Sequence, residues 1–297
     1  MVSNWLRGIL TGSFLILLAF NPPVKSAPHT HESGLQHAHD GSPQHSHQSK
    51  PRPVQEPIPA FQAAYISIII DDLGHNYRRG LRALDLPAPI TYSILPYSTH
   101  AKRLATVVHE SGKEVMLHLP MQNVWDLDMG PGGLTSTQNK AEFEQAIAIA
   151  ISQVPFAMGI NNHMGSELTQ MNMPMEWLME NIQNRNLFFV DSRTTPKSVA
   201  SKVAQQKQLR TASRDIFLDN DPSPHAINHQ FRKLIRLAKR RGTAIAICHP
   251  YRETLAFLEM AIPQLASEGI EIIPASNLLA LQQVFDLQLA QGVMGSE

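Results

Sequence analysis

The chain has little cysteine, no excess of charge and no apolar run long enough to cross a membrane. Its single cysteine, Cys248, excludes an intramolecular disulfide even in an oxidising compartment. Basic and acidic side chains number 25 each, so the basic surface that nucleic-acid binding requires is not expected. Apolar residues make up 43% of the 297 residues, which is enough for a normal core. We therefore expect a folded domain that does not bind nucleic acid.

The N-terminal segment has the pattern of a secretory signal. Arg7 precedes an apolar stretch of 12 residues, 9–20, which is shorter than the ~20 residues of a membrane span. Residues 1–26 therefore predict export across the inner membrane to the periplasm, with Ser26 at an acceptable cleavage position. An uncleaved signal that anchors the chain is the alternative, and the lack of cysteine there excludes lipidation at that point.

Residues 27–60 have low complexity and no apolar period, which predicts a disordered linker. The segment is rich in Pro, Ser, Gln and Gly, and it contains six histidines in three His-x-His pairs. Such pairs could hold zinc or copper loosely, or the linker could be a solvated spacer. We expect one folded domain over residues 61–287, without internal repeats, and a C-terminal tail over residues 288–297.

A run of β-branched residues, 66–70, predicts a buried strand that ends in two adjacent carboxylates, Asp71 and Asp72. Two like charges at one strand end raise the cost of ionisation for each other, and a metal ion or a proton would relieve that cost. Neighbouring strand residues face opposite sides, but both can reach one site where the chain turns. The alternative is a turn that caps the next helix.

The same pattern, an apolar run followed by His or Asp, recurs along the chain. Helical patterns over 101–111, 140–153, 174–184 and 225–241 separate most of the runs, and this alternation predicts parallel strands. The carboxyl ends of parallel strands lie on one face, so the polar residues at those ends should meet in a metal-dependent hydrolase site on an α/β barrel. They are Asp71, Asp72, His118, His163, Asp191, Asp219 and His249.

Three other features have simpler interpretations. Cys248 precedes His249, but strand neighbours face opposite sides, so a buried structural thiol is expected rather than a nucleophile. The glycine-rich segment 130–133 lacks the Lys and Ser/Thr of a phosphate loop, which indicates a flexible rim loop. Trp125 could stack on a sugar ring, or could belong to the core or the rim.

Five motifs occur in an order that resembles the divergent polysaccharide deacetylases, a branch of the polysaccharide deacetylase superfamily. The resemblance spans about residues 65–279 and implies an α/β fold, a distorted (β/α) barrel with about seven parallel strands, and a divalent ion of the zinc type. The motifs lie at residues 68–74, 117–121, 159–166, 189–195 and 246–251.

The resemblance assigns roles residue by residue. Asp71 matches the catalytic base, Asp72 the metal-binding aspartate, and His118 the first histidine of a His-x-x-x-His metal motif. The second position of that motif is Gln122, a poor zinc ligand, and His163 is the expected substitute.

The remaining matches concern the acid and its surroundings. His249 matches the late catalytic histidine, and Asp191 falls where its partner is expected. Arg193 could neutralise Asp71 or pair on the rim, and Asn162 is a support residue. Asp219 is a further candidate, and the alternative is that it only caps the loop 220–222.

These matches imply a metal-dependent hydrolase that removes N-acetyl groups from an envelope glycan or a peptidoglycan-like polymer, by attack of a metal-bound water. The alternative is a non-catalytic barrel that binds an envelope glycan or a protein partner. Gln122, and the absence of the superfamily's Arg-Pro-Pro loop, motivate that alternative.

Overall fold

The computed structural model describes residues 63–294. The expected signal segment and the histidine-rich linker lie outside these residues. Within them, no helix has the length and apolarity needed to cross a membrane.

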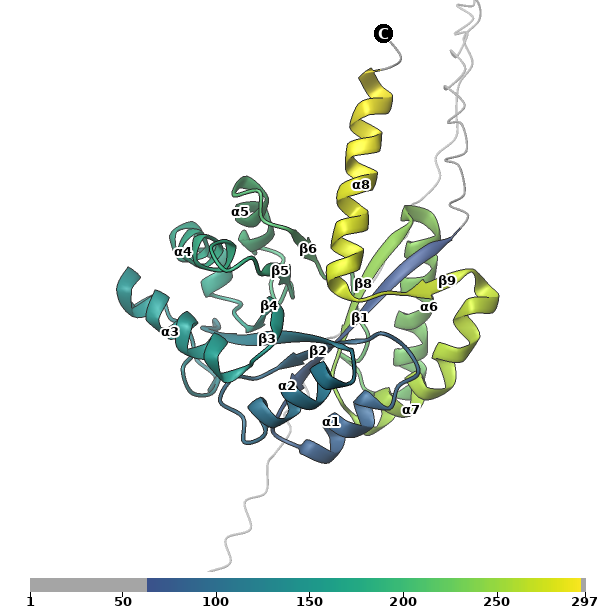
Figure 1. Cartoon of the computed structure of the whole chain (residues 1–297), viewed down its shortest axis with the longest axis horizontal. Coiled ribbons are helices and arrows are strands. Elements are labelled where there is room, and N and C mark those ends of the chain that lie inside the picture. The colour runs from purple at the N-terminus through teal and green to yellow at the C-terminus, as the bar shows by residue number, and fades with distance from the viewer. Residues whose placement is uncertain (1–62, 295–297) are drawn as a thin grey trace, which may run out of the picture. The chain divides into compact units, whose positions relative to one another are not determined.

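A single sheet forms the centre of the domain and curls into an open half-barrel (Figure 1). Its nine strands pair in the order β6-β5-β4-β3-β2-β1-β8-β7, and β9 pairs with β1 beside this path. Every pairing is parallel. The strands are β1 (Ala64–Leu73), β2 (Thr91–Ile94), β3 (Glu114–Met121), β4 (Ala157–Met164), β5 (Phe188–Asp191), β6 (Thr211–Ser213), β7 (Ile216–Phe217), β8 (Thr243–Cys248) and β9 (Ile270–Ile272).

Helices connect the strands and cover the convex face of the sheet (Figure 1). Parallel neighbours need such crossovers, because a short turn cannot return the chain to the same end of the sheet. They are α1 (Tyr77–Leu84), α2 (Ala101–Glu110), α3 (Lys140–Gln153), α4 (Asn172–Gln183), α5 (Ala200–Gln206), α6 (Pro224–Arg241) and α7 (Arg252–Ala261), with 3-10 turns η1 (Leu168–Gln170) and η2 (Ile262–Glu268). The last helix, α8 (Ala275–Met294), follows β9 and packs on the concave face.

Two hydrophobic cores lie on the two faces of the sheet. Ile68 and Ile70 of β1 belong to the large core beneath the helices, whereas Ile69 between them belongs to a smaller core on the concave face. This alternation follows from the two-residue period of a strand. Leu278 of α8 fills the concave core, so the residues beyond it along each strand remain free to form a site.

The predicted distorted barrel of parallel strands is confirmed. The sheet has nine strands rather than about seven, but β6, β7 and β9 contain only two or three residues each. The four predicted helices correspond to α2, α3, α4 and α6. Helix α8 continues to Met294, past Leu287 where the sequence predicted the domain to end.

Candidate active site

Five of the predicted residues gather at the carboxyl ends of the strands. Asp71, His118 and His249 each stand two positions after a residue of the concave core, so strand alternation points them to the concave face. Asp72 and His163 complete the group. The structure thus brings together side chains from β1, β3, β4 and the end of β8.

Asp72 reaches this face because the backbone turns. As the neighbour of Asp71 in β1, it would otherwise face the helices. Its φ of 56° is left-handed, a conformation that aspartate adopts more readily than most residues, and the β1–β2 register is irregular between Ile70 and Leu73. The turn expected from the sequence therefore brings both carboxylates to one site.

Asp72, His118 and His163 offer three atoms with the spacing of metal ligands. Asp72 Oδ1 lies 3.0 Å from His163 Nδ1 and 3.3 Å from His118 Nε2, and the two ring nitrogens are 3.2 Å apart. Tetrahedral ligands at roughly 2.0–2.1 Å from zinc are about 3.3 Å from one another. Asp72 Oδ1 is buried and accepts no hydrogen bond, a costly state that a cation would relieve. The donor set fits a divalent ion of the zinc type.

Asn161 connects the ligand set to Asp71. Its Oδ1 accepts hydrogen bonds from Ser93 Oγ at 2.6 Å and from His118 Nδ1 at 2.8 Å, and its Nδ2 donates to Asp71 Oδ1 at 2.8 Å. With Nδ1 of His118 donating, the lone pair of Nε2 points to the ligand cluster. The sequence analysis missed Asn161. Its position two residues before His163 in β4, on the same face, was the available signal.

The surroundings shift the pKa values of Asp71 and Asp72 in opposite directions. Burial raises the pKa of Asp71 despite its contacts with His118 and His249. Burial also opposes ionisation of Asp72, but its contacts with His118 and His163 outweigh this and lower its pKa. Burial alone would lower the pKa of His118, yet the two carboxylates raise it to about 8. Adjacent residues in the sequence therefore have opposite protonation tendencies.

His249 is oriented by Asp219. His249 Nδ1 lies 3.0 Å from Asp219 Oδ1, while Asp219 Oδ2 accepts from the His249 backbone N–H at 2.7 Å and from Thr254 Oγ1 at 2.8 Å. Nε2 faces the ligand cluster, 3.6 Å from Asp72 Oδ2. Burial disfavours the charged ring, but Asp219 outweighs burial and raises the pKa of His249.

The expectation that Asp191 orients His249 is wrong. Asp191 stands two residues after Phe189 in β5, and Phe189 belongs to the core beneath the helices, so Asp191 faces away from the concave side. Its carboxylate instead accepts from Ser198 Oγ at 2.8 Å and from the Arg193 backbone N–H at 2.8 Å. Asp219, for which the sequence left loop capping as the alternative, holds the position expected for Asp191.

The other candidates occupy the loops around the site. Gln122 points away from it, to Glu167 Oε2 and to the Ser136 backbone N–H. Asn162 ties loops together by donating to the Met164 carbonyl and accepting from the Ser192 N–H. Cys248 is buried in the core, as expected, and burial raises the pKa of its thiol.

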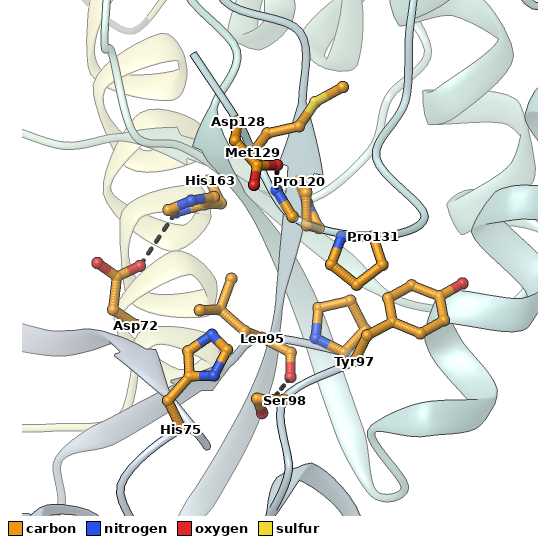
Figure 2. A pocket seen from close by; sticks show the side chains of 12 residues that line it. Asp72, His75, Leu95, Tyr97, Ser98, Pro120, Asp128, Met129, Pro131 and His163 are labelled. Atoms are coloured by element: carbon orange, nitrogen blue, oxygen red, sulfur yellow. Dashed lines mark hydrogen bonds and ion pairs between the residues drawn. The ribbon is translucent and has the colours of Figure 1, made fainter. Parts of the chain in front are cut away.

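Three adjoining cavities lie at this end of the sheet, and the first two contact the ligand cluster. The first, about 440 Å³, is bounded on one edge by the Asp72–His163 pair and elsewhere by groups that include Asp128, Tyr97, Met129 and Pro131 (Figure 2). The second, about 410 Å³, also contacts Asp72 and His163 and adds Asp71, His118, His249, Arg193 and Arg214. The third, about 530 Å³, adjoins the second at Met164 and Thr194 and carries Trp125, whose side chain is 78% exposed and therefore not in the core.

The chain belongs to the divergent polysaccharide deacetylase family, whose sequence pattern matches residues 68–279. It is 36% identical over 222 residues to the uncharacterized protein YibQ of Escherichia coli K12, covering 75% of this chain and 69% of that protein. An uncharacterized protein of Haemophilus influenzae is 33% identical over 225 residues, 76% of this chain and 80% of that protein.

The fold is also similar to a solved structure. The crystal structure of an uncharacterized protein from Agrobacterium tumefaciens C58 has a TM-score of 0.71 at 21% identity, covering 75% of this chain and 92% of that one. The family and the fold define a polysaccharide deacetylase-like barrel.

Proposed function

We propose that the protein is a metal-dependent hydrolase that removes N-acetyl groups from an envelope glycan. The observation that carries the proposal is the triangle of Asp72, His118 and His163, with Asp71 and His249 on the same cavity. Three protein ligands with room for water are typical of catalytic zinc sites. When bound there, a divalent cation supplies Lewis acidity that polarises the acetamide carbonyl and lowers the pKa of water.

The protein's own groups move the protons. Asp71, held by Asn161, accepts a proton from the attacking water as the new C–O bond forms at the acetamide carbon. His249 Nε2 donates a proton to the leaving nitrogen as the C–N bond breaks, while Asp219 holds Nδ1. One water is consumed, and the products are acetate and a free amine on the sugar. The raised pKa of His249 favours the protonated acid before the reaction.

The test combines metal content with acetate release from peptidoglycan fragments and chitooligomers. Asp71→Asn should keep its metal and lose turnover by 100-fold or more, because it removes the base and leaves the ligands intact. Asp72→Ala and His163→Ala should lose the metal. If both of these variants retain wild-type zinc, the ligand assignment is wrong.

The competing function is glycan binding without turnover, which the Gln122 position motivates. It predicts that metal-loaded protein binds glycan fragments but releases no acetate from any of them. If the wild-type protein releases acetate no faster than the Asp71→Asn variant, this result would favour the binding function.

We also propose that the protein is exported, on the basis of residues 1–26. Fractionation of cells, followed by N-terminal sequencing of the mature protein, tests this. A soluble cytosolic protein that begins at Met1 would refute export.

A further inference from the structure

The second cavity, defined above by Asp71, His249, Arg193 and Arg214, contains two arginines close together. Arg193 and Arg214 both line it, and in the described part of the chain neither guanidinium forms an ion pair with a carboxylate. Of the nearby carboxylates, Asp215 pairs with Arg241, whereas Asp191 accepts a hydrogen bond from Ser198 Oγ and contributes a negative charge near Arg214.

Hydrogen bonds to backbone carbonyls hold the Arg214 guanidinium next to Arg193. Arg214 Nε donates to the Ser192 carbonyl at 2.7 Å and its Nη2 donates to the Arg193 carbonyl at 3.0 Å. Arg193 has a left-handed φ of 47°, and its N–H is held by Asp191. The Arg214 guanidinium also lies 4.9 Å from the centre of the Phe217 ring, which in turn lies 5.4 Å from the His249 ring. Two cations are thus held close together beside the proposed acid.

The charges of the cavity leave room for an anion. Asp71 and Asp72, even with both ionised, balance only a divalent cation. Asp191, which accepts hydrogen bonds only from uncharged donors, offsets one of the two arginines, so a net positive charge remains beside the second cavity. The first cavity shares Asp72 and His163 but has no Lys or Arg among its lining residues (Figure 2). An anionic group is therefore favoured in the second cavity and not in the first.

We propose that Arg193 and Arg214 bind a carboxylate of the substrate, so that the substrate is an acidic N-acetylated glycan. The inference rests on the proposed function. Because the pair lies beside His249, which protonates the leaving amine, the carboxylate belongs to the sugar that keeps the nitrogen and not to the acyl group. Guanidinium groups bind carboxylates through paired N–H donors, which suits this recognition.

The test compares two probes that differ in one charge. They are the methyl glycoside of a 2-acetamido sugar with a 3-O-lactyl carboxylate, and the same compound with the lactyl group as its carboxamide. Dissociation constants are measured by NMR titration of the full-length, zinc-loaded protein. The carboxylate should bind about tenfold to 100-fold more tightly, the range of a charge-assisted hydrogen bond.

The variants identify the source of this preference. Arg193→Gln should reduce the preference at least fivefold, and Arg193→Lys should keep part of it. Arg78→Gln, which removes an exposed charge on α1, should leave the preference unchanged. A carboxylate that bound only to the metal would keep its preference in Arg193→Gln, and this result would overturn the proposal. Equal binding of the two probes by the wild-type protein would also overturn it.

Acetate release separates this inference from the proposed function. An Arg193-dependent preference without acetate release from either probe would support the carboxylate site and count against deacetylation. Release at equal kcat/KM from both probes, unaffected by Arg193→Gln, would support deacetylation and refute the carboxylate site.

Discussion

Asn161 offers a sharp test of how the site is held together. Asn161→Ala removes the acceptor of His118 Nδ1 and the donor to Asp71 Oδ1 in one change, and it also leaves Ser93 without its partner. All of these groups are buried, so no bulk water replaces the lost hydrogen bonds. The variant should therefore affect both metal affinity and stability.

The two effects have different sizes. Loss of a partner that fixes a metal-ligating histidine typically lowers metal affinity by about 10-fold to 100-fold, which is roughly 1.4–2.7 kcal/mol. Each buried polar group left unsatisfied costs about 1–3 kcal/mol, so the metal-free protein should lose at least ~2 kcal/mol of stability. For a domain of this size that corresponds to a decrease of about 4–8 °C in Tm.

Asn162→Ala is the matched control. Asn162 is the next residue, is equally buried and also makes two side-chain hydrogen bonds, but it contacts loops and no ligand atom. Zinc affinity is measured by competition with a chelating dye, and Tm by calorimetry of the metal-free proteins. Asn162→Ala should lose stability and keep its zinc affinity. Zinc affinity within threefold of wild type for Asn161→Ala, or an equal loss in both variants, would refute the reasoning.

Three further predictions concern pH, the acid and the rim. The pKa of His118 is raised to about 8 in the metal-free protein, so protonated His118 stabilises the fold fully below pH ~6.5, and this contribution is lost as the pH rises to about 8. Urea unfolding should show that the free energy of unfolding falls by up to roughly 2 kcal/mol over this window. His118→Gln should abolish this pH dependence. Asp219→Asn should lower kcat/KM at least tenfold and shift the alkaline limb of the pH–rate profile to lower pH, whereas Asp191→Asn should leave that limb in place. Trp125→Ala should raise KM for polymeric substrates about 2-fold to 10-fold without changing kcat, and an unchanged KM would exclude stacking.

The sequence predicted the parts of the site that follow from strand alternation and strand ends. Asp71, His118 and His249 could be placed because each ends an apolar run, and parallel strands put these ends on one face. The turn at Asp72 could also be anticipated, because two adjacent carboxylates at a strand end must either separate or bend the chain. These inferences need only local periodicity and the fold class.

The partners of these residues could not be predicted in the same way. Whether Asp191 or Asp219 reaches His249 depends on the face of the sheet to which the side chain at each strand end points. Strand β7 has only two residues, which are too few to establish the alternation of side chains between the two faces. Arg214 follows a three-residue strand, and its contacts with the 192–193 backbone are tertiary. Short strands carry too few residues for a period, so their side-chain directions are fixed by packing.

Strand geometry explains why the proposed ligand set uses His163 rather than position 122, the second position of the His-x-x-x-His motif. In this chain β3 runs on to Met121, so position 122 lies about 13 Å along the strand from His118 at ~3.3 Å per residue. Ligand atoms of one tetrahedral ion are only about 3.3 Å apart. His163 is on the adjacent strand, where Asn161 pairs with His118 and His163 pairs with Pro120, which is within side-chain reach.

This geometry predicts that a histidine at position 122 cannot restore the site. His163→Ala should lose its zinc, and Gln122→His in the same chain should not recover it, because the side chain at 122 points to Glu167 and Ser136. Gln122→His alone should keep wild-type zinc affinity and lose a little stability through those two hydrogen bonds. Dye competition on the three variants measures the outcome. If the double variant binds zinc to within tenfold of wild type, the backbone at the end of β3 can change its conformation. The ligand set would then depend on loop conformation and not on strand register.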